Sequence, residues 1–354
     1  MAITIKDIAK ATGVSTMTVS RFLNEPEKLK PSTYEKVKKA VDEMGYEPNQ
    51  VARLLQTNKT NIICVYIANG IDPLHPFTLR AISGIGEKLG LEGYSMQICR
   101  HDYKKVKCDG VIAMGMTERE EDEVMKWFKD KPVIVFGNSS YKNNWIDIDN
   151  YKGGYMATEH LLKRGYKKIA NIGIRSEEKY TQDRLNGYMD CMRDYHMDIP
   201  QSGIMRVCNN EDDGYLAASR ILKNADVDAI VCASDALALG VMRCAVKMEI
   251  NVPNELGVTG FDGLGYEKLV TPHITTVEQP VYASGIALAE CIVNILRNND
   301  YSETEKFIKP ILNINQMPYV IMFYRDFCPI FVRKNTDIRK YELVKESHSP
   351  QLIK

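Results

Sequence analysis

The chain of 354 residues lacks the features that mark membrane, secreted and strongly charged proteins. It contains no run of about 18 apolar residues that could span a bilayer, and its start shows no charged-apolar-cleavage pattern of a secretory signal. Lys and Arg together number 46, Asp and Glu also number 46, and the formal net charge is zero. We expect a cytoplasmic protein without a membrane partner, and composition alone does not indicate nucleic acid.

Motifs of the common enzyme classes are also absent. The chain has no P-loop, no G-x-S-x-G elbow, and no His spaced with a nucleophile and a carboxylate as in a triad. The stretch GIGEKLG at 84–90 is similar to a dinucleotide fingerprint, but it begins well after the apolar run that ends near Ala68. We interpret its glycines as a close contact between helices, and we expect neither an enzyme nor a cofactor.

Nine cysteines are scattered along the chain, and this odd number is typical of reduced thiols in a cytoplasm. Cys99, His101 and Cys108 lie close together in the sequence. Their spacing matches no familiar zinc pattern and a fourth ligand is missing, so we expect no metal site.

Residues 4–25 predict two short helices joined by a tight turn. Thr4 can cap the first helix with Asp7 in the reciprocal position, Gly13 permits a left-handed turn, and Ser15 can cap the second helix. Two short helices joined in this way form a helix-turn-helix. The alternative is an ordinary helical hairpin with a solvated polar face.

The second helix has a polar face that suits DNA. Its apolar positions are Val14, Val19 and Leu23. The side chains left on the outer face are those of Thr16, Met17, Ser20 and Arg21. Hydroxyl groups and an Arg on an exposed helix can contact phosphates and base edges in a major groove.

Two further elements follow the helix-turn-helix. Residues 31–44 predict a third helix, with Ser32 and Glu35 as a capping box and Gly45 as its end. The segment that starts at Pro48 is apolar, has no polar stripe and is too short for a stable isolated helix. It therefore needs a partner to order it.

Residues 4–57 resemble the DNA-binding head and hinge of the LacI/GalR family of bacterial repressors, through TIKDIAKATGVSTMTVSRFLN, GYEPNQVARLL and their spacing. The resemblance implies that the hinge helix folds on operator DNA, where Leu55 enters the minor groove and kinks the duplex. It places Ala52 at the contact between two hinge helices and Asn49 among the DNA-contacting residues. It also implies base reading by Thr16 and Met17, with Ser20 and Arg21 beside them. Met17 replaces a more usual polar residue, so we expect it to read shape or a thymine methyl.

The head has a modest positive charge. Residues 1–60 contain ten Lys or Arg and seven Asp or Glu, a balance of +3, which leaves −3 for the remainder. A dimer doubles the charge of the heads. We expect weak non-specific affinity with strong salt sensitivity.

From residue 61 onward, short apolar runs alternate with helical stretches. This rhythm predicts parallel sheets with helices on both faces, and the number of runs indicates two lobes with a cleft. The expected strands lie within 61–69, 94–99, 109–115, 132–137, 145–149, 168–173, 203–207, 229–234 and 256–261. The family resemblance implies the same α/β fold, a doubly wound periplasmic-binding-protein-like core after a three-helix head.

We divide the chain accordingly. Residues 1–47 form the predicted head, 48–60 the hinge helix and linker, 61–312 the effector-binding and dimerisation domain, and 313–354 an atypical tail. In the effector domain, the first lobe is expected at about 61–148 and 279–300, and the second at about 149–278 and 301–312.

Six residues are carried over from the family as effector contacts. They are Phe77, Asp149, Arg184, Ser234, Asp235 and Asp262. Acidic groups and an Arg that converge with one aromatic ring suit a sugar, because they bind vicinal hydroxyls while the ring stacks on the apolar face. The alternative for Asp149 and Asp235 is that they only cap helices. A nucleobase ligand stays open, although polar Asn209 stands where purine sensors present a second aromatic residue.

The chain departs from the family pattern in two places. Residues 100–108 connect two expected parallel strands, and about a dozen residues are usual for such a crossover, so a helix of the first lobe is missing. The region from 313 onward replaces the family's closing pattern with apolar runs such as Tyr319–Phe323. Extra strands, an interface and foreign sequence are all open for this tail.

These patterns predict a ligand-controlled repressor of a carbohydrate operon. A homodimer would read two half-sites of double-stranded operator DNA, and a small sugar or sugar phosphate would release it. One alternative keeps the fold but activates it through a corepressor or a phosphorylated carrier protein. Another is a sugar-binding protein without a DNA function.

Overall fold

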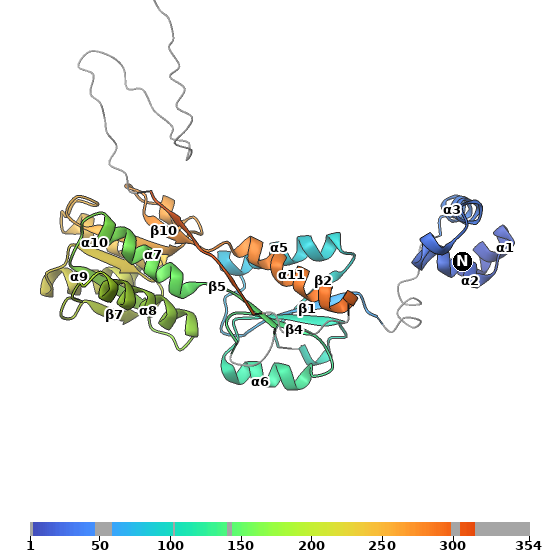
Figure 1. Cartoon of the computed structure of the whole chain (residues 1–354), viewed down its shortest axis with the longest axis horizontal. Coiled ribbons are helices and arrows are strands. Elements are labelled where there is room, and N and C mark those ends of the chain that lie inside the picture. Colours follow the sequence, from blue (N-terminus) through green and yellow to red (C-terminus); the bar gives the residue numbers. More distant parts are fainter. Residues whose placement is uncertain (1–2, 47–58, 102, 140–143, 299–304, 316–354) are drawn as a thin grey trace, which may run out of the picture. The chain divides into compact units, whose positions relative to one another are not determined.

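The computed structural model describes residues 3–46, 59–101, 103–139, 144–298 and 305–315. Its N-terminal part is a three-helix head (Figure 1), made of α1 (Ile5–Thr12), α2 (Thr16–Asn24), a 3-10 turn (Pro26–Lys28) and α3 (Pro31–Met44). Ile8, Val19 and Val37 come from the three helices and are fully buried against one another. This small core confirms the helix-turn-helix and the third helix.

The helix ends follow the expected caps with one exception. The Asp7 carboxylate accepts a hydrogen bond from the Thr4 N–H at 2.9 Å, and Ser15 Oγ accepts one from the Thr18 N–H at 3.1 Å. Gly13 ends α1 with a φ of 63°, a left-handed conformation that favours glycine. The capping box predicted at Ser32 is wrong, because α3 begins one residue earlier at Pro31, whose φ suits the first helical position.

The first lobe is built on a sheet of six parallel strands. In spatial order they are β11 (Glu305–Ile308), β5 (Asn144–Ile148), β4 (Val133–Phe136), β3 (Gly110–Met114), β1 (Ile62–Ile67) and β2 (Ser95–Cys99). Helices α5 (Pro76–Leu91) and α11 (Val281–Asn298) cover one face and α6 (Glu118–Trp127) the other (Figure 1). Alternate residues of β1 pack toward each face, as expected of a strand buried on both sides.

The second lobe repeats this architecture. Its sheet has the order β12 (Ile311–Asn313), β10 (Thr275–Glu278), β9 (Gly257–Asp262), β8 (Ala229–Cys232), β6 (Ile169–Ile174) and β7 (Ile204–Val207), with only β12 antiparallel among these strands. Helices α7 (Asn150–Lys163) and α8 (Lys179–Asp194) pack on one face. Helices α9 (Glu211–Asn224) and α10 (Asp235–Lys247) pack on the other.

The nine expected strands are all present, and three short ones were not predicted. These are β10, β11 and β12, none longer than four residues. The assignment of 301–312 to the second lobe is wrong for Glu305–Ile308, which pairs in parallel with β5 of the first sheet. This strand lies at the edge of the first sheet, next to β5.

The glycines of 84–90 lie within α5, as the sequence predicts. A Cβ added at Gly84 would lie 2.1 Å from the carbonyl oxygen of Tyr282, and one added at Gly285 would lie 2.3 Å from that of Ala81. Neither position has space for a side chain. The glycines therefore allow α5 and α11 to pack backbone against backbone.

In the shortened connection between β2 and β3, the described residues include a 3-10 turn, Tyr103–Lys105, and no α-helix. Tyr103 is 7% exposed, and its ring centroid lies 5.0 Å from that of Tyr66 and 6.0 Å from that of Phe128. The prediction that this crossover lacks an α-helix agrees with its described residues, 100–101 and 103–108. Tyr103 packs in the buried cluster on the face of the sheet that α6 covers.

Replacing Tyr103 with alanine is expected to destabilise the first lobe by about 3 kcal/mol, because a buried aromatic ring is lost and a cavity remains. Chemical unfolding followed by circular dichroism measures this loss. The control is Lys107→Ala, since Lys107 is an exposed residue of the same connection. Equal unfolding midpoints for the two variants would show that Tyr103 does not replace the missing helix.

Cys64 and Cys99 form a disulfide between β1 and β2. The expectation that all thiols are reduced is wrong for this pair in the structure. Adjacent parallel strands place the two side chains in the same buried cluster, two residues apart in register, which the spacing in the sequence does not reveal. Among the helices of the described ranges, none has the length and apolar character needed to cross a bilayer.

Candidate effector site and DNA-contacting surface

The predicted base-reading residues share one face of α2. Thr16 and Arg21 are exposed, Ser20 is half-buried, and Met17 is 66% exposed, which is unusual for a large apolar side chain. The geometry therefore makes the α2 surface available as the sequence predicts. The hinge residues assigned to DNA contact, Asn49, Ala52 and Leu55, lie outside the described residues.

Arg184 on α8 is the centre of the candidate effector site. Its side chain is only 6% exposed, and its Nε donates to Asn150 Oδ1 at 2.9 Å. Its Nη1 donates to the carbonyl oxygen of Ala233 at 2.6 Å and lies 3.3 Å from Asp262 Oδ1. One guanidinium thus forms hydrogen bonds at the carboxyl ends of β5, β8 and β9, where ligands of parallel α/β sheets bind.

The Arg184 guanidinium contacts two aromatic rings. The Arg184 Cζ lies 3.7 Å from the centroid of the Phe261 ring and 4.9 Å from that of Tyr180. A delocalised cation is stabilised by contact with ring faces, most strongly where water is excluded. The rings and the hydrogen bonds together leave Arg184 one orientation.

Asp262 ends β9 in a strained conformation. Its φ is 117°, a value that non-glycine residues rarely adopt. Its Oδ1 accepts a hydrogen bond from Gln279 Nε2 at 2.7 Å, and its carbonyl oxygen accepts one from the Gln279 N–H at 3.0 Å. Such strain persists when surrounding contacts outweigh it, and it concentrates at functional sites.

Asp235 is buried, with hydrogen bonds to both of its carboxylate oxygens. It is 0% exposed; its Oδ1 accepts from the Thr276 hydroxyl and its Oδ2 from the Gly263 N–H at 2.8 Å. The prediction that Asp235 contacts effector disagrees with this geometry, because both oxygens are occupied and covered. Its alternative, a helix cap, is also not observed, since Ser234 caps α10.

Burial, and then the charge of Asp262, raise the pKa of Asp235 to about 8. Burial also raises the pKa of Asp262, while Arg184 opposes that rise. The two carboxyls interact, so their protons belong to the pair. The pair therefore holds a proton near neutral pH, while Arg184 favours the ionised form of Asp262.

Asp149 and Ser234 act as helix caps in the structure. Asp149 Oδ1 accepts from the Lys152 N–H at 2.8 Å, and Ser234 Oγ accepts from the Leu237 N–H at 3.2 Å. The Ser234 hydroxyl also donates to Asn209, the polar residue noted in the sequence. Their roles as effector contacts stay predictions, and capping accounts for their positions.

Two further residues to consider, Phe77 on α5 and Asp147 on β5, lie in the first lobe. The Phe77 ring stacks on that of Phe136, with centroids 5.3 Å apart. Asp147, on β5, accepts hydrogen bonds from the backbone N–H groups of Asn138 and Ile148. Burial raises the pKa of Asp147 to about 6, and the charge of Arg184 opposes that rise.

Four residues of this constellation were missed by the sequence analysis. They are Asp147, Asn150, Tyr180 and Gln279. Asp147 and Asn150 sit in the same stretch as Asp149, and their strand-end position was a usable signal. Gln279 follows a four-residue strand that was not predicted, so nothing local indicated it.

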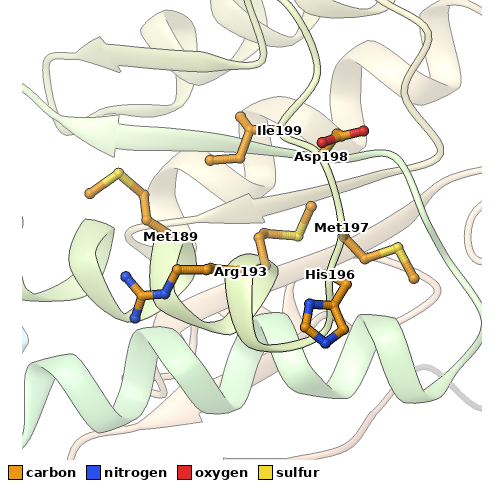
Figure 2. A pocket seen from close by; sticks show the side chains of 7 residues that line it. Met189, Arg193, His196, Met197, Asp198 and Ile199 are labelled. Atoms are coloured by element: carbon orange, nitrogen blue, oxygen red, sulfur yellow. The ribbon is translucent and has the colours of Figure 1, made fainter.

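A separate cavity of about 430 Å³ lies at the C-terminal end of α8 (Figure 2). It contains none of the predicted effector residues. Its lining residues are Met189, Met192, Arg193, His196, Met197, Asp198 and Ile199. The Arg193 side chain pairs with Asp190 at 2.8 Å on the outside of the same helix.

Two family models match the chain in order. The model for "Bacterial regulatory proteins, lacI family" matches residues 4–49, and that for "Periplasmic binding proteins and sugar binding domain of LacI family" matches 98–317. YvdE of Bacillus subtilis (strain 168), an uncharacterized HTH-type transcriptional regulator, is 33% identical over 315 residues, 88% of this chain and 98% of that protein.

Solved structures share the fold. A Lac repressor dimer bound to operator and the anti-inducer ONPF has a TM-score of 0.72 at 21% identity, and a complex of the regulator CelR with cellobiose has one of 0.66 at 24%. Each alignment covers 88% of this chain and 98% of the other. The matched models and the relative at 33% identity lead to one conclusion: the chain belongs to the LacI family of bacterial regulatory proteins and is a transcriptional regulator with a DNA-binding helix-turn-helix head.

Proposed function

We propose that this regulator represses a carbohydrate-utilisation operon. A homodimer binds a palindromic operator through two heads, and a small sugar bound near Arg184 and Asp262 releases it. The observation that carries the proposal is the Arg184 constellation, in which side chains from α8, β9 and the segment after β10 converge. Converging hydrogen-bonding groups suit a sugar ring with several hydroxyls, and Phe77 stays the predicted ring that stacks on its apolar face.

The charges around Arg184 favour an uncharged sugar over a sugar phosphate. The carboxylates of Asp147 and Asp262 both interact with Arg184. More acidic groups lie nearby: the charge of Asp183 raises the pKa of Asp147, and the charge of Asp149 raises the pKa of Asp183. Arg184 already donates its Nε and Nη1 to groups of the protein. A phosphate would meet an excess of carboxylates, whereas hydroxyl groups can donate hydrogen bonds to them.

The function is tested by measuring operator binding with and without sugars. Thermal shift with maltose, cellobiose, lactose, ribose and glucose 6-phosphate selects ligands, and fluorescence anisotropy on a palindromic duplex at low salt then measures release. Weaker operator binding with a neutral sugar supports the proposal. Tighter binding indicates a corepressor instead, and sugar binding without any operator binding indicates a sugar-binding protein that lacks a DNA function.

Met17 is expected to recognise a thymine methyl group in the operator. Replacing the contacted thymine with deoxyuridine removes one methyl, which is worth about 0.8 kcal/mol when buried, or about fourfold in affinity. In Met17→Ala the same base change should have no effect, because the partner of the methyl group is gone. Anisotropy titrations of the wild type and Met17→Ala on the thymine and deoxyuridine duplexes give the four affinities of a double-mutant cycle. If the base change lowered the affinity of both proteins equally, Met17 would not contact the methyl group.

Leu55→Ala is expected to weaken operator binding about 100-fold while non-specific binding stays unchanged, because inserted apolar side chains compensate the cost of unstacking and bending the duplex. Leu54→Ala, a change in the neighbouring position, serves as the control. Titrations on operator and on a scrambled duplex give the two affinities. A loss of the same size on both duplexes would refute the role assigned to Leu55.

A further inference from the structure

The segment Asp262–Gly265 comprises the last residue of β9 and the turn that follows. Residues of both lobes form hydrogen bonds with it. On the side of the second lobe, the Gly263 N–H donates to Asp235 Oδ2 at 2.8 Å, and the Gly265 N–H donates to Glu267 Oε2 at 2.8 Å. Gly263 has a φ of 64°, and a Cβ there would lie 2.7 Å from Glu278 Cα. The turn therefore fits against the end of β10 with no space for a side chain at Gly263.

The contact from the first lobe is made by Arg80. This half-buried residue of α5 donates from Nη1 to the carbonyl oxygen of Gly263 at 3.1 Å and from Nη2 to that of Leu264 at 3.0 Å. A planar guanidinium places two parallel donors at a fixed spacing, so it restrains two successive carbonyl groups together. A single ammonium has no such geometry.

The side chain of Leu264 reaches into the first lobe as well. It is 7% exposed and packs in the buried cluster formed by β1, α5 and α11, with the partly buried ring of Tyr266 against the same cluster. The segment is therefore part of the second lobe by chain position and part of the first lobe by packing. Its first residue, Asp262, carries the carboxylate at the proposed effector site.

We propose that Arg80 is a positioning residue, which restrains the Asp262 turn across the lobe boundary and so links occupancy of the effector site to the orientation of the lobes. The link to occupancy rests on the proposed function. A ligand that engages Asp262 acts on a turn whose carbonyl groups Arg80 holds. Any displacement of this turn is then transmitted to α5 of the first lobe.

Hydrogen–deuterium exchange of the full, ligand-free chain tests the restraint. In Arg80→Ala, the amide hydrogens of Gly263 and Gly265 should exchange about tenfold faster or more. In the wild type, opening of the turn must break two hydrogen bonds from Arg80, and in the variant it need not, so the turn opens more often. Arg80→Lys should recover part of the protection. Arg119→Ala is the control, since that side chain is 90% exposed on α6 of the same lobe. Unchanged exchange in Arg80→Ala overturns the proposal.

The link to function is tested by the ratio of operator affinities without and with the releasing sugar, using maltose, cellobiose, lactose and ribose as probes. Arg80→Ala should reduce this ratio about fivefold or more, within the usual range of allosteric coupling, and leave operator affinity without sugar unchanged. Arg80→Lys should restore part of it. An unchanged ratio, or an equal loss of affinity with and without sugar, overturns the proposal. A wild-type protein that ignores every probe contradicts the proposed function, and the exchange experiment still decides on the restraint.

Discussion

Arg184→Ala should abolish the response to sugar and destabilise the second lobe by about 3–5 kcal/mol, the range for removing one partner of a buried ion pair. The cause is that Asp262, whose side chain is 14% exposed, would lose the cation that opposes the burial-driven rise of its pKa, and Asn150 would lose the donor to its amide oxygen. Thermal unfolding measures the stability, and anisotropy at low temperature measures operator binding with and without sugar. Operator binding itself should survive, because the head has its own core.

Two variants separate the contributions of charge and geometry at this position. Arg184→Lys keeps the charge but loses the planar fork, so it should recover part of the stability and little of the sugar response. Arg193→Ala changes an Arg on the same helix whose side chain is 72% exposed, and such surface pairs contribute about 0–1 kcal/mol. A normal sugar response in Arg184→Ala would remove this residue from the site, and a stability loss no larger than that of Arg193→Ala would remove it from the centre of the network.

Asp235→Asn should remove a dependence of stability on pH between about 4 and 8. An unfolded aspartate loses its proton near pH 3.9, whereas burial and Asp262 raise the pKa of Asp235 to about 8 in the folded protein. The folded state therefore holds an extra proton in this window, and stability falls as pH rises, by at most about 1.4 kcal/mol per pH unit. Asparagine cannot titrate, and it can still accept from Gly263 and donate to Thr276.

Melting temperatures measured from pH 5 to 9 test this expectation. The advantage of Asp235→Asn over the wild type should already be present at pH 5 and should grow up to pH 8, whereas Asp235→Ala should be less stable than Asp235→Asn at both pH values, by about 1–3 kcal/mol for the unsatisfied partners. Asp147→Asn provides a contrast, because the pKa of Asp147 is raised only to about 6. The stability difference between this variant and the wild type should therefore stop growing above pH 6. A wild-type slope between pH 6 and 8 in Asp235→Asn would show that Asp235 is not the group that holds the proton.

The site residues show where inference from local sequence ends. Arg184 and Asp262 were predicted from family motifs, and the structure brings them within 3.3 Å although 78 residues separate them. Asp235 was predicted to touch the effector, yet its partners Gly263 and Thr276 come from other segments and occupy both of its oxygens. Neighbouring side chains along a chain point in different directions, so a motif locates a residue without telling which group it meets.

The sequence by itself determined the elements whose cause is local. Periodicity, caps and turn glycines were sufficient for the helix-turn-helix, for the nine longer or more apolar strands and for the Gly84 contact, because each depends on residues a few positions apart. Only the tertiary structure decided that β11 joins the first sheet, that Cys64 meets Cys99, and that Arg80 reaches the turn after Asp262. Those three outcomes depend on which strand edges and helix faces meet once the chain has built both lobes. Residues that are far apart in the sequence make these contacts, so no local sequence pattern predicts them.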